Sequence, residues 1–171
     1  MEVFHVNEAT LVRYAQEEDT PLILEFIRAL AEYEHLLDQV EADEASLRKF
    51  LFQDHIARVL IGEYQGEPAG FALFFRNFST FLGKPGIYIE DLFVKPELRG
   101  RGLGKILLSF IAKIAAEEHC GRLEWSCLNW NKPSIAFYRG QGARPLSEWT
   151  TYRLSGDAIK ILGDNCKVPV L

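Results

Sequence analysis

A glycine-rich stretch with three basic residues carries the clearest chemistry in this chain of 171 residues. It covers residues 99–105 (Arg-Gly-Arg-Gly-Leu-Gly-Lys), after an apolar segment and before a long helical pattern. The first amides of a helix are unpaired and carry a positive partial charge, and glycines let the backbone approach a ligand closely. Such a loop suits a pyrophosphate, whose charge Arg99, Arg101 and Lys105 can neutralise.

Two common nucleotide-binding motifs do not fit this loop. A Walker A loop needs glycine five residues before Gly104, where Arg99 stands. A dinucleotide-binding fingerprint needs glycine at the sixth position from Gly100, where Lys105 stands. A glycine-rich turn that binds no ligand is the plain alternative. The segments around the loop must therefore decide what it holds.

The first part of the chain alternates strand and helix patterns. Residues 10–15 alternate as a short strand should. Asp19-Thr20-Pro21 marks a helix start, with a capping acid and a proline in the first turn, and that helix is expected to end near His35. A second short helix is expected over 43–53.

Three strands are expected before the glycine loop, and a long helix after it. Segments 59–64 and 69–76 flank the turn signal Gln65-Gly66-Glu67-Pro68 and form a hairpin. Segment 87–94 is aromatic and β-branched enough for a central strand, and it ends at Lys95-Pro96. The helix carries an apolar stripe at helical spacing: Leu103, Ile106, Leu107, Phe110, Ile111, Ile114 and Ala115.

The remaining elements indicate the fold class. A strand is expected over 122–128, a helix over 133–141 and a last strand over 148–154. The strand–helix–strand order between 87 and 128 requires a parallel crossover, whereas the hairpin is antiparallel. We therefore expect one α/β (α+β mixed) domain over 1–171, with a mixed, mostly antiparallel sheet and helices on both faces.

Composition and charge exclude several classes of protein. The net charge is −5, which argues against a nucleic-acid partner, because such partners need a basic face. No apolar run reaches the roughly 18–20 residues that a membrane-spanning helix needs, so we expect no membrane partner. The acidic N-terminus lacks the pattern of a signal peptide.

The cysteines and histidines do not form recognisable ligand sets. Cys120, Cys127 and Cys166 are odd in number and include no Cys-x-x-Cys pair, which favours free thiols and a cytoplasmic location. The four histidines have no ligand spacing, so we expect no metal. They are His5, His35, His55 and His119.

Four separated segments together resemble the GNAT N-acetyltransferase superfamily. Arg99-x-x-Gly102-x-Gly104 is similar to its acetyl-CoA signature, and residues 129–143 look like its closing strand–helix segment. Residues 31–34 and 88–94 look like the spermidine/spermine and thialysine acetyltransferase branch. The resemblance runs from about residue 10 to 155, and the four segments agree in order and spacing.

The resemblance implies how acetyl-CoA is held as co-substrate. The parallel strands 87–94 and 122–128 would splay apart to form the acetyl-CoA slot. The backbone of Leu92, Phe93 and Val94 would bind the pantetheine arm, and the amides of Gly100, Arg101, Gly102, Leu103, Gly104 and Lys105 the pyrophosphate. A further set would contact the cofactor from the far side: Asn131, Lys132, Pro133 and Ser134.

The resemblance also implies two catalytic residues. A lysine-like amine has a pKa near 10.4, so its neutral form at pH 7.4 costs about 4 kcal/mol, and Glu90 would accept its proton. Alternatively, Glu90 only pairs with a cation. Asp91 is expected on the opposite face by strand alternation. Tyr138 would protonate the leaving thiolate as general acid, the alternative being a tyrosine that only packs.

The expected substrate is a small cationic amine. By resemblance, it would be contacted by Tyr33, Glu34, Glu124, Trp125 and Ser126. Residues 77–81 contain no acid, and Ala29 stands where polyamine enzymes carry one, which favours a diamine or a lysine-like amine over spermidine. Acetylation of a protein or peptide and a non-catalytic acetyl-CoA-binding module are the alternatives. The branch implies a homodimer, and the apolar end 168–171 either meets a partner or is frayed.

Overall fold

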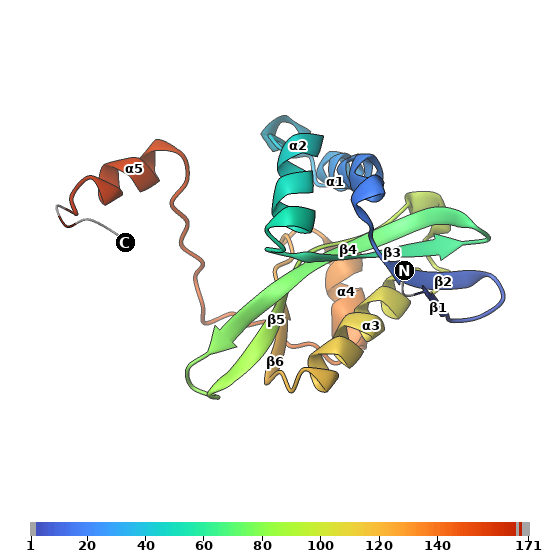
Figure 1. The fold of residues 1–171 in the computed structure, drawn as a ribbon. Coiled ribbons are helices and arrows are strands. Elements are labelled where there is room, and N and C mark those ends of the chain that lie inside the picture. Colours follow the sequence, from blue (N-terminus) through green and yellow to red (C-terminus); the bar gives the residue numbers. More distant parts are fainter. Residues whose placement is uncertain (1–2, 167, 169–171) are drawn as a thin grey trace. The chain divides into compact units, whose positions relative to one another are not determined.

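The computed structural model of the protein describes residues 3–166 and 168 (Figure 1). The chain divides into two compact units, one up to Leu128 and one from Asn129, and we describe each separately. Of the apolar end considered above, residues 169–171 lie outside the described residues.

The first unit contains six strands and three α-helices among its described residues. The strands are β1 Val3–His5, β2 Thr10–Tyr14, β3 Arg58–Tyr64, β4 Glu67–Ser79, β5 Lys84–Val94 and β6 Arg122–Trp125. The α-helices are α1 Thr20–Tyr33, α2 Glu44–Leu47 and α3 Leu103–Glu117. Short 3-10 turns η1, η2 and η4 cover Glu17–Asp19, Leu37–Gln39 and Pro96–Leu98, and η3 is a π-helix over Arg48–Gln53.

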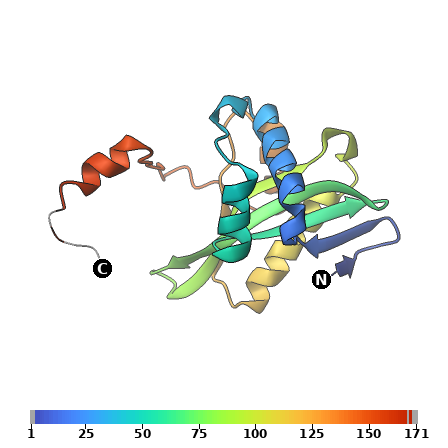
Figure 2. The ribbon, with the colours of Figure 1, turned by 45° about the horizontal axis from the view of Figure 1, so that its top comes forward.

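The strands form one sheet in the order β1-β2-β3-β4-β5-β6. Neighbours are antiparallel except β5 and β6, which are parallel and joined through α3. Helices α1 and α2 cover one face, the α1 face, and α3 covers the other, the α3 face (Figures 1 and 2). This architecture confirms the predicted mixed, mostly antiparallel sheet with helices on both faces.

Aromatic packing fixes α1 on its face of the sheet. The Phe26 ring stacks on Phe71 with centroids 5.4 Å apart, and it lies 6.1 Å from the Phe93 ring. All three side chains are buried, each contributing roughly 1.5–3 kcal/mol of burial free energy. On the α3 face, Leu107 and Ile111 belong to the apolar stripe predicted from the sequence, and both are fully buried.

An ion cluster holds the start of α1 against the sheet. Arg13 on β2 contacts Asp19 through Nη1 at 2.6 Å and Glu63 through Nε at 2.7 Å. Asp19 precedes α1, but its side chain makes no capping hydrogen bond to that helix and accepts from the Gln16 amide instead. Burial would raise the pKa of Asp19, but the hydrogen bonds from Arg13 and Gln16 lower it overall.

Several predicted boundaries differ from the structure. The predicted helix over 43–53 divides into α2 and the π-helical η3, and the strand expected over 122–128 ends at Trp125. The prediction of a strand over 148–154 is wrong, because these residues form no strand and are exposed. An alternating pattern says which side chains a strand would bury, but it supplies no neighbouring strand to complete the ladder.

The second unit contains two helices among its described residues, α4 Lys132–Gly140 and α5 Asp157–Gly163. Helix α4 matches the helix predicted over 133–141, and Gly142 follows it in the left-handed region with φ 88°. Across the described parts of both units, no helix is long and apolar enough to cross a membrane.

Candidate active site

A β-bulge in β5 lies at the centre of the candidate site. Phe74 of β4 pairs with Ile89 and Leu73 pairs with Asp91, so Glu90 is an additional residue without a partner on β4. Because Leu73 lies in the α1-face core, its partner Asp91 occupies that face as well. The strand alternation used to place Asp91 away from Glu90 therefore does not hold across the bulge.

The bulge brings carboxylates close enough to influence one another. Burial, followed by the charges of Glu90 and Glu34, raises the pKa of Asp91 to about 7. Burial also raises the pKa of Glu34, which directly follows α1. The pKa of the Cys127 thiol is raised by burial and by the charge of Glu34. A carboxyl group that titrates near neutral pH is well suited to accept a proton.

Sequence reasoning passed over Asp91 as a functional residue, because it relied on regular alternation. The available signal was the adjacent pair Glu90 and Asp91 in a strand that is otherwise apolar. Neither carboxylate has an ion pair among the described residues. We refer to Glu90 and Asp91 as the acid pair.

Strands β5 and β6 separate beside the acid pair. Their parallel pairing covers Gly86–Ile89 and Arg122–Trp125 and then stops. From Glu90 to Val94, β5 has β4 on one edge and no described strand on the other. This open edge, which contains Leu92, Phe93 and Val94, is where the sequence predicts the pantetheine arm of the cofactor.

The glycine loop follows the open edge and leads directly into α3. Gly100 and Gly102 have φ angles of 76° and 86°, which favour glycine. A Cβ at either position would meet nothing within 4 Å. Gly102 is the N-cap of α3 and provides no side-chain cap, so the first amides of α3 receive no capping bond from it. Leu103 is buried, Gly104 half-buried and Lys105 exposed, which leaves one side of the turn accessible.

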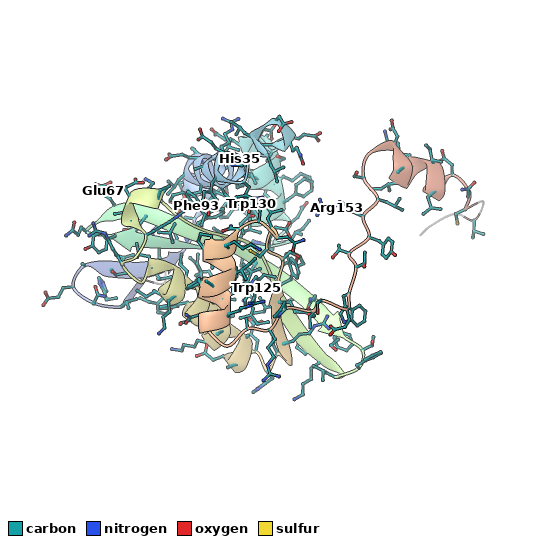
Figure 3. All side chains as sticks on the ribbon, turned by 180° about the vertical axis from the view of Figure 1, so that it is seen from behind. His35, Glu67, Phe93, Trp125, Trp130 and Arg153 are labelled. Atoms are coloured by element: carbon teal, nitrogen blue, oxygen red, sulfur yellow. The ribbon has the colours of Figure 1, made fainter. Side chains whose placement is uncertain are left out.

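Arg99 has a different environment from the one predicted for a phosphate ligand. Its guanidinium lies 4.3 Å from the centroid of the Tyr33 ring and 5.8 Å from that of Phe93. Its Nε donates to the carbonyl oxygen of Val94 at 3.0 Å. Phe93 lies on the sheet below the end of α1, which His35 marks in Figure 3. Arg99 therefore connects the glycine loop to the end of α1.

The basic residue Arg101 stays near the surface. Its Nη1 donates to the Tyr64 hydroxyl at 3.1 Å, and its guanidinium lies 5.1 Å from the centre of the Tyr64 ring. Both Arg101 and Lys105 are exposed beside the loop. They remain the predicted neutralisers of a bound pyrophosphate.

The β6 residues predicted to contact substrate lie on two different faces. Glu124 pairs with Tyr88, and the Tyr88 hydroxyl lies 2.7 Å from the Ser126 hydroxyl, so Glu124 and Ser126 share one side. Trp125 pairs with Ile89, whose buried side chain faces α3. The structure therefore brings Tyr33, Glu34, Glu124 and Ser126 to the α1 face and places Trp125 on the other.

The remaining predicted residues belong to the second unit. Asn131 is buried and caps α4, since its Oδ1 accepts from the Ser134 amide at 3.2 Å. Lys132 and Pro133 are exposed in the first turn of α4. Tyr138 is half-buried on α4, with its ring centroid 5.2 Å from that of Phe137. The roles expected for these residues remain predictions.

Within the described residues, no group of three or more histidine, cysteine, aspartate or glutamate side chains is arranged to hold a metal ion. The candidate site combines the glycine turn before α3, an open strand edge and the acid pair.

Comparisons with known proteins identify the family and several relatives of this chain. Residues 14–143 match the model of the acetyltransferase (GNAT) family. The chain is 38% identical over 166 residues to the thialysine N-epsilon-acetyltransferase of Sus scrofa, covering 90% of this chain and 97% of that protein. It is 46% identical over 94 residues to an L-ornithine N5-acetyltransferase of Arabidopsis thaliana, covering 55% of this chain and 41% of that protein. A solved integron cassette protein from V. cholerae is 26% identical with a TM-score of 0.76, covering 92% of this chain and 99% of that one.

Proposed function

This chain belongs to the acetyltransferase (GNAT) family, and from that membership we propose that it transfers an acetyl group from acetyl-CoA to the primary amine of a small cationic molecule. The family uses acetyl-CoA as co-substrate, and its members are acyltransferases. The observation that carries the proposal is the acid pair beside the open edge of β5, with the pKa of Asp91 near 7. We name a lysine-like or ornithine-like amine as the preferred substrate, by similarity to the relatives above.

The acid pair addresses the first chemical problem, which is obtaining a neutral amine. An alkyl ammonium near pKa 10.4 must lose a proton before its nitrogen can attack. Glu90 and Asp91 are adjacent carboxylates, and the charge of Glu90 adds to the burial that raises the pKa of Asp91. We propose that this pair attracts the ammonium and accepts its proton, with Glu34 adding to the attraction.

The glycine loop and the open edge address the second problem, which is holding the thioester. The turn at Gly100 and Gly102, where an added Cβ would meet nothing within 4 Å, suits the pyrophosphate, and the exposed Arg101 and Lys105 add positive charge. The open edge at 92–94 offers backbone groups to the amides of the pantetheine arm. The cofactor would then deliver its thioester beside the acid pair.

Tyr138 is the proposed general acid. As the amine nitrogen bonds to the acetyl carbon, the carbon–sulfur bond breaks and leaves a thiolate. A phenol with a pKa near 10 protonates that thiolate at an uphill cost of about 2 kcal/mol, which positioning can offset. The half-buried position of Tyr138 on α4 is compatible with this role.

Two further expectations remain proposals. A homodimer is supported by the exposed apolar tip of the β4–β5 hairpin: Phe78 at the end of β4 is 61% exposed, and Phe81 and Leu82 in the turn are 96% and 53% exposed. A cytoplasmic location is supported by the free cysteines Cys120, Cys127 and Cys166.

One assay tests the proposed function. The purified chain is incubated with acetyl-CoA and thialysine, ornithine, short diamines, spermidine or a lysine-containing peptide, and free thiol is measured. We expect release with a small amine, and Tyr138→Phe should lower kcat by roughly 100-fold or more. Turnover of the peptide alone would favour the protein acetyltransferase, and coenzyme A binding without any turnover would favour the binding module. A near-normal rate for Tyr138→Phe would remove the proposed acid.

A further inference from the structure

An ion pair lies on the α1 face of β6, next to the acid pair but further from the point where β5 and β6 separate. Arg122 and Glu124 are two residues apart on β6 and therefore share a face. Glu124 Oε2 is 2.9 Å from Arg122 Nε and accepts from Asn77 Nδ2 at 3.2 Å. The carboxylate expected to attract a cationic substrate is thus already partly neutralised.

This ion pair keeps unused hydrogen-bonding capacity. Both contacts of Glu124 involve Oε2, and its Oε1 takes part in neither. Arg122 Nε is buried without a well-formed hydrogen bond, since its approach to Glu124 is close but poorly aligned, and Nη2 donates to the Phe78 carbonyl at 3.4 Å. The two side chains are 35% and 30% exposed, and because Arg122 Nε is buried, a small molecule can reach the Arg122 charge only at its terminal nitrogens.

The spacing between the ion pair and the acid pair matches one kind of substrate. Glu124 is level with Tyr88, two residues before Glu90, which is about 7 Å along a strand. A lysine-type side chain spans a similar length, about 6 Å from its Cα to its amine. The Tyr88 ring contacts Phe75, with centroids 5.4 Å apart, and offers an apolar surface for the methylene groups between the two ends.

We propose that the Arg122–Glu124 ion pair binds the zwitterionic head of an amino acid whose side-chain amine reaches the acid pair. Arg122 donates to the α-carboxylate, and Glu124 accepts from the α-ammonium. A diamine gains less binding free energy at this ion pair, because its distal ammonium meets a carboxylate that Arg122 already partly neutralises. This inference rests on the proposed function and specifies its substrate as a basic amino acid with a free head group.

Three amines with the same chain test the two contacts separately. They are thialysine, the diamine that lacks its carboxylate, and the ω-amino acid that lacks its α-amine. Wild-type kcat/KM should be about tenfold or more higher for thialysine than for the diamine, as expected for a hydrogen bond between charged groups. Arg122→Gln should remove this preference while changing the rate with the diamine less than about twofold. Glu124→Gln should lower kcat/KM for thialysine but not for the ω-amino acid.

Two further variants keep this test interpretable. Arg76→Gln is the matched control, because Arg76 lies on β4 facing α3 and contacts Glu118 Oε2 at 2.9 Å; it should keep the wild-type preference. Arg122→Lys retains the positive charge and should retain part of the preference, which separates recognition from misfolding.

An equal loss of activity on all three amines with Arg122→Gln, or a wild-type preference for the diamine, overturns the inference while leaving the proposed acetyl transfer intact. No thiol release with any amine would instead refute the proposed function.

Discussion

Replacing Asp91 by asparagine should stabilise the protein, and the gain should grow with pH. Burial and the charges of Glu90 and Glu34 raise the pKa of Asp91 from 3.8 to about 7 in the folded state. The folded protein therefore holds a proton between about pH 4 and pH 7 that the unfolded chain has released. The contribution of Asp91 to the free energy of unfolding must fall as pH rises through this window, because the ionised carboxylate is tolerated poorly in the fold.

The size of the effect follows from the size of the shift. About three pKa units correspond to about 4 kcal/mol once Asp91 is ionised in both states, which is an upper limit above pH 8. The penalty falls below about 1 kcal/mol near pH 4, because the unfolded carboxyl also begins to hold its proton there. The asparagine side chain does not titrate. The difference in free energy of unfolding between Asp91→Asn and the wild type should therefore increase from pH 4 to pH 8.

Urea denaturation followed by tryptophan fluorescence at pH 4.5 and pH 8 measures this difference. Asp19→Asn serves as the control with opposite sign, because the pKa of Asp19 is lowered in the fold. Its charge stabilises the protein at neutral pH, and that contribution disappears as pH falls through the folded pKa, so Asp19→Asn should destabilise most at pH 8. If Asp91→Asn lowers stability equally at both pH values, the carboxylate is not held in an unfavourable environment, and its proposed role as proton acceptor loses its physical basis.

Three more predictions address separate parts of the molecule. Glu90→Gln should shift the activity profile toward higher pH, where more free amine exists, and an unchanged profile would remove Glu90 from the acid pair's function. Arg99→Lys should raise KM for the amine as well as for acetyl-CoA by roughly 3- to 10-fold, because it weakens the contact with Tyr33, whereas Arg101→Lys should affect acetyl-CoA alone; identical effects of the two variants in steady-state kinetics would contradict this. His119 has φ 55° after α3, so His119→Gly should stabilise by about 0.5–1 kcal/mol and raise Tm by roughly 2–4 °C in calorimetry. A gain of the same size with His119→Ala would show that backbone conformation is not the cause.

The parts of the fold with strong local signals were predictable from the sequence. The apolar stripe of α3 defines a helix because seven positions recur at helical spacing. The hairpin between β3 and β4 was equally clear, since Gln65 and Gly66 adopt φ angles of 53° and 84° in a tight turn. The relation of β5 to β6 followed from the helix between them, because a parallel pair needs a crossover.

Features that depend on a partner strand or on an interruption of the pattern were not predictable. The alternation of 87–94 gives no sign of the extra residue at Glu90, which appears only in the register with β4. The segment 148–154 alternates like a strand, yet it has no ladder in the described part of the chain. Strand β1 was not anticipated, since its three residues pair with β2 but are too few for a pattern.

At the candidate site, the types of the residues were easier to predict than the directions in which their side chains point. A basic residue at position 99 suggested a phosphate contact, which stays a prediction, but its contacts with the Tyr33 ring and the Val94 carbonyl could not be read from the sequence. Similarly, three consecutive residues at the end of β6, Glu124, Trp125 and Ser126, were assigned to one substrate, although Glu124 and Trp125 lie on opposite faces of the sheet.

The bulge at Glu90 makes chain length in β5 as important as chain composition. Deleting Glu90 would remove the bulge, and Asp91, Leu92 and Phe93 would keep their partners on β4 and their faces. Inserting a residue after Asp91 would instead move Leu92, Phe93 and Val94 to the opposite faces. A redesign that made this strand regular would complete its pairing with β4 and keep Asp91 opposite Leu73 on the α1 face, yet it would remove Glu90 from the acid pair. Sequence variation at this point should therefore be confined to substitutions, and insertions or deletions should be borne by the turn between β4 and β5.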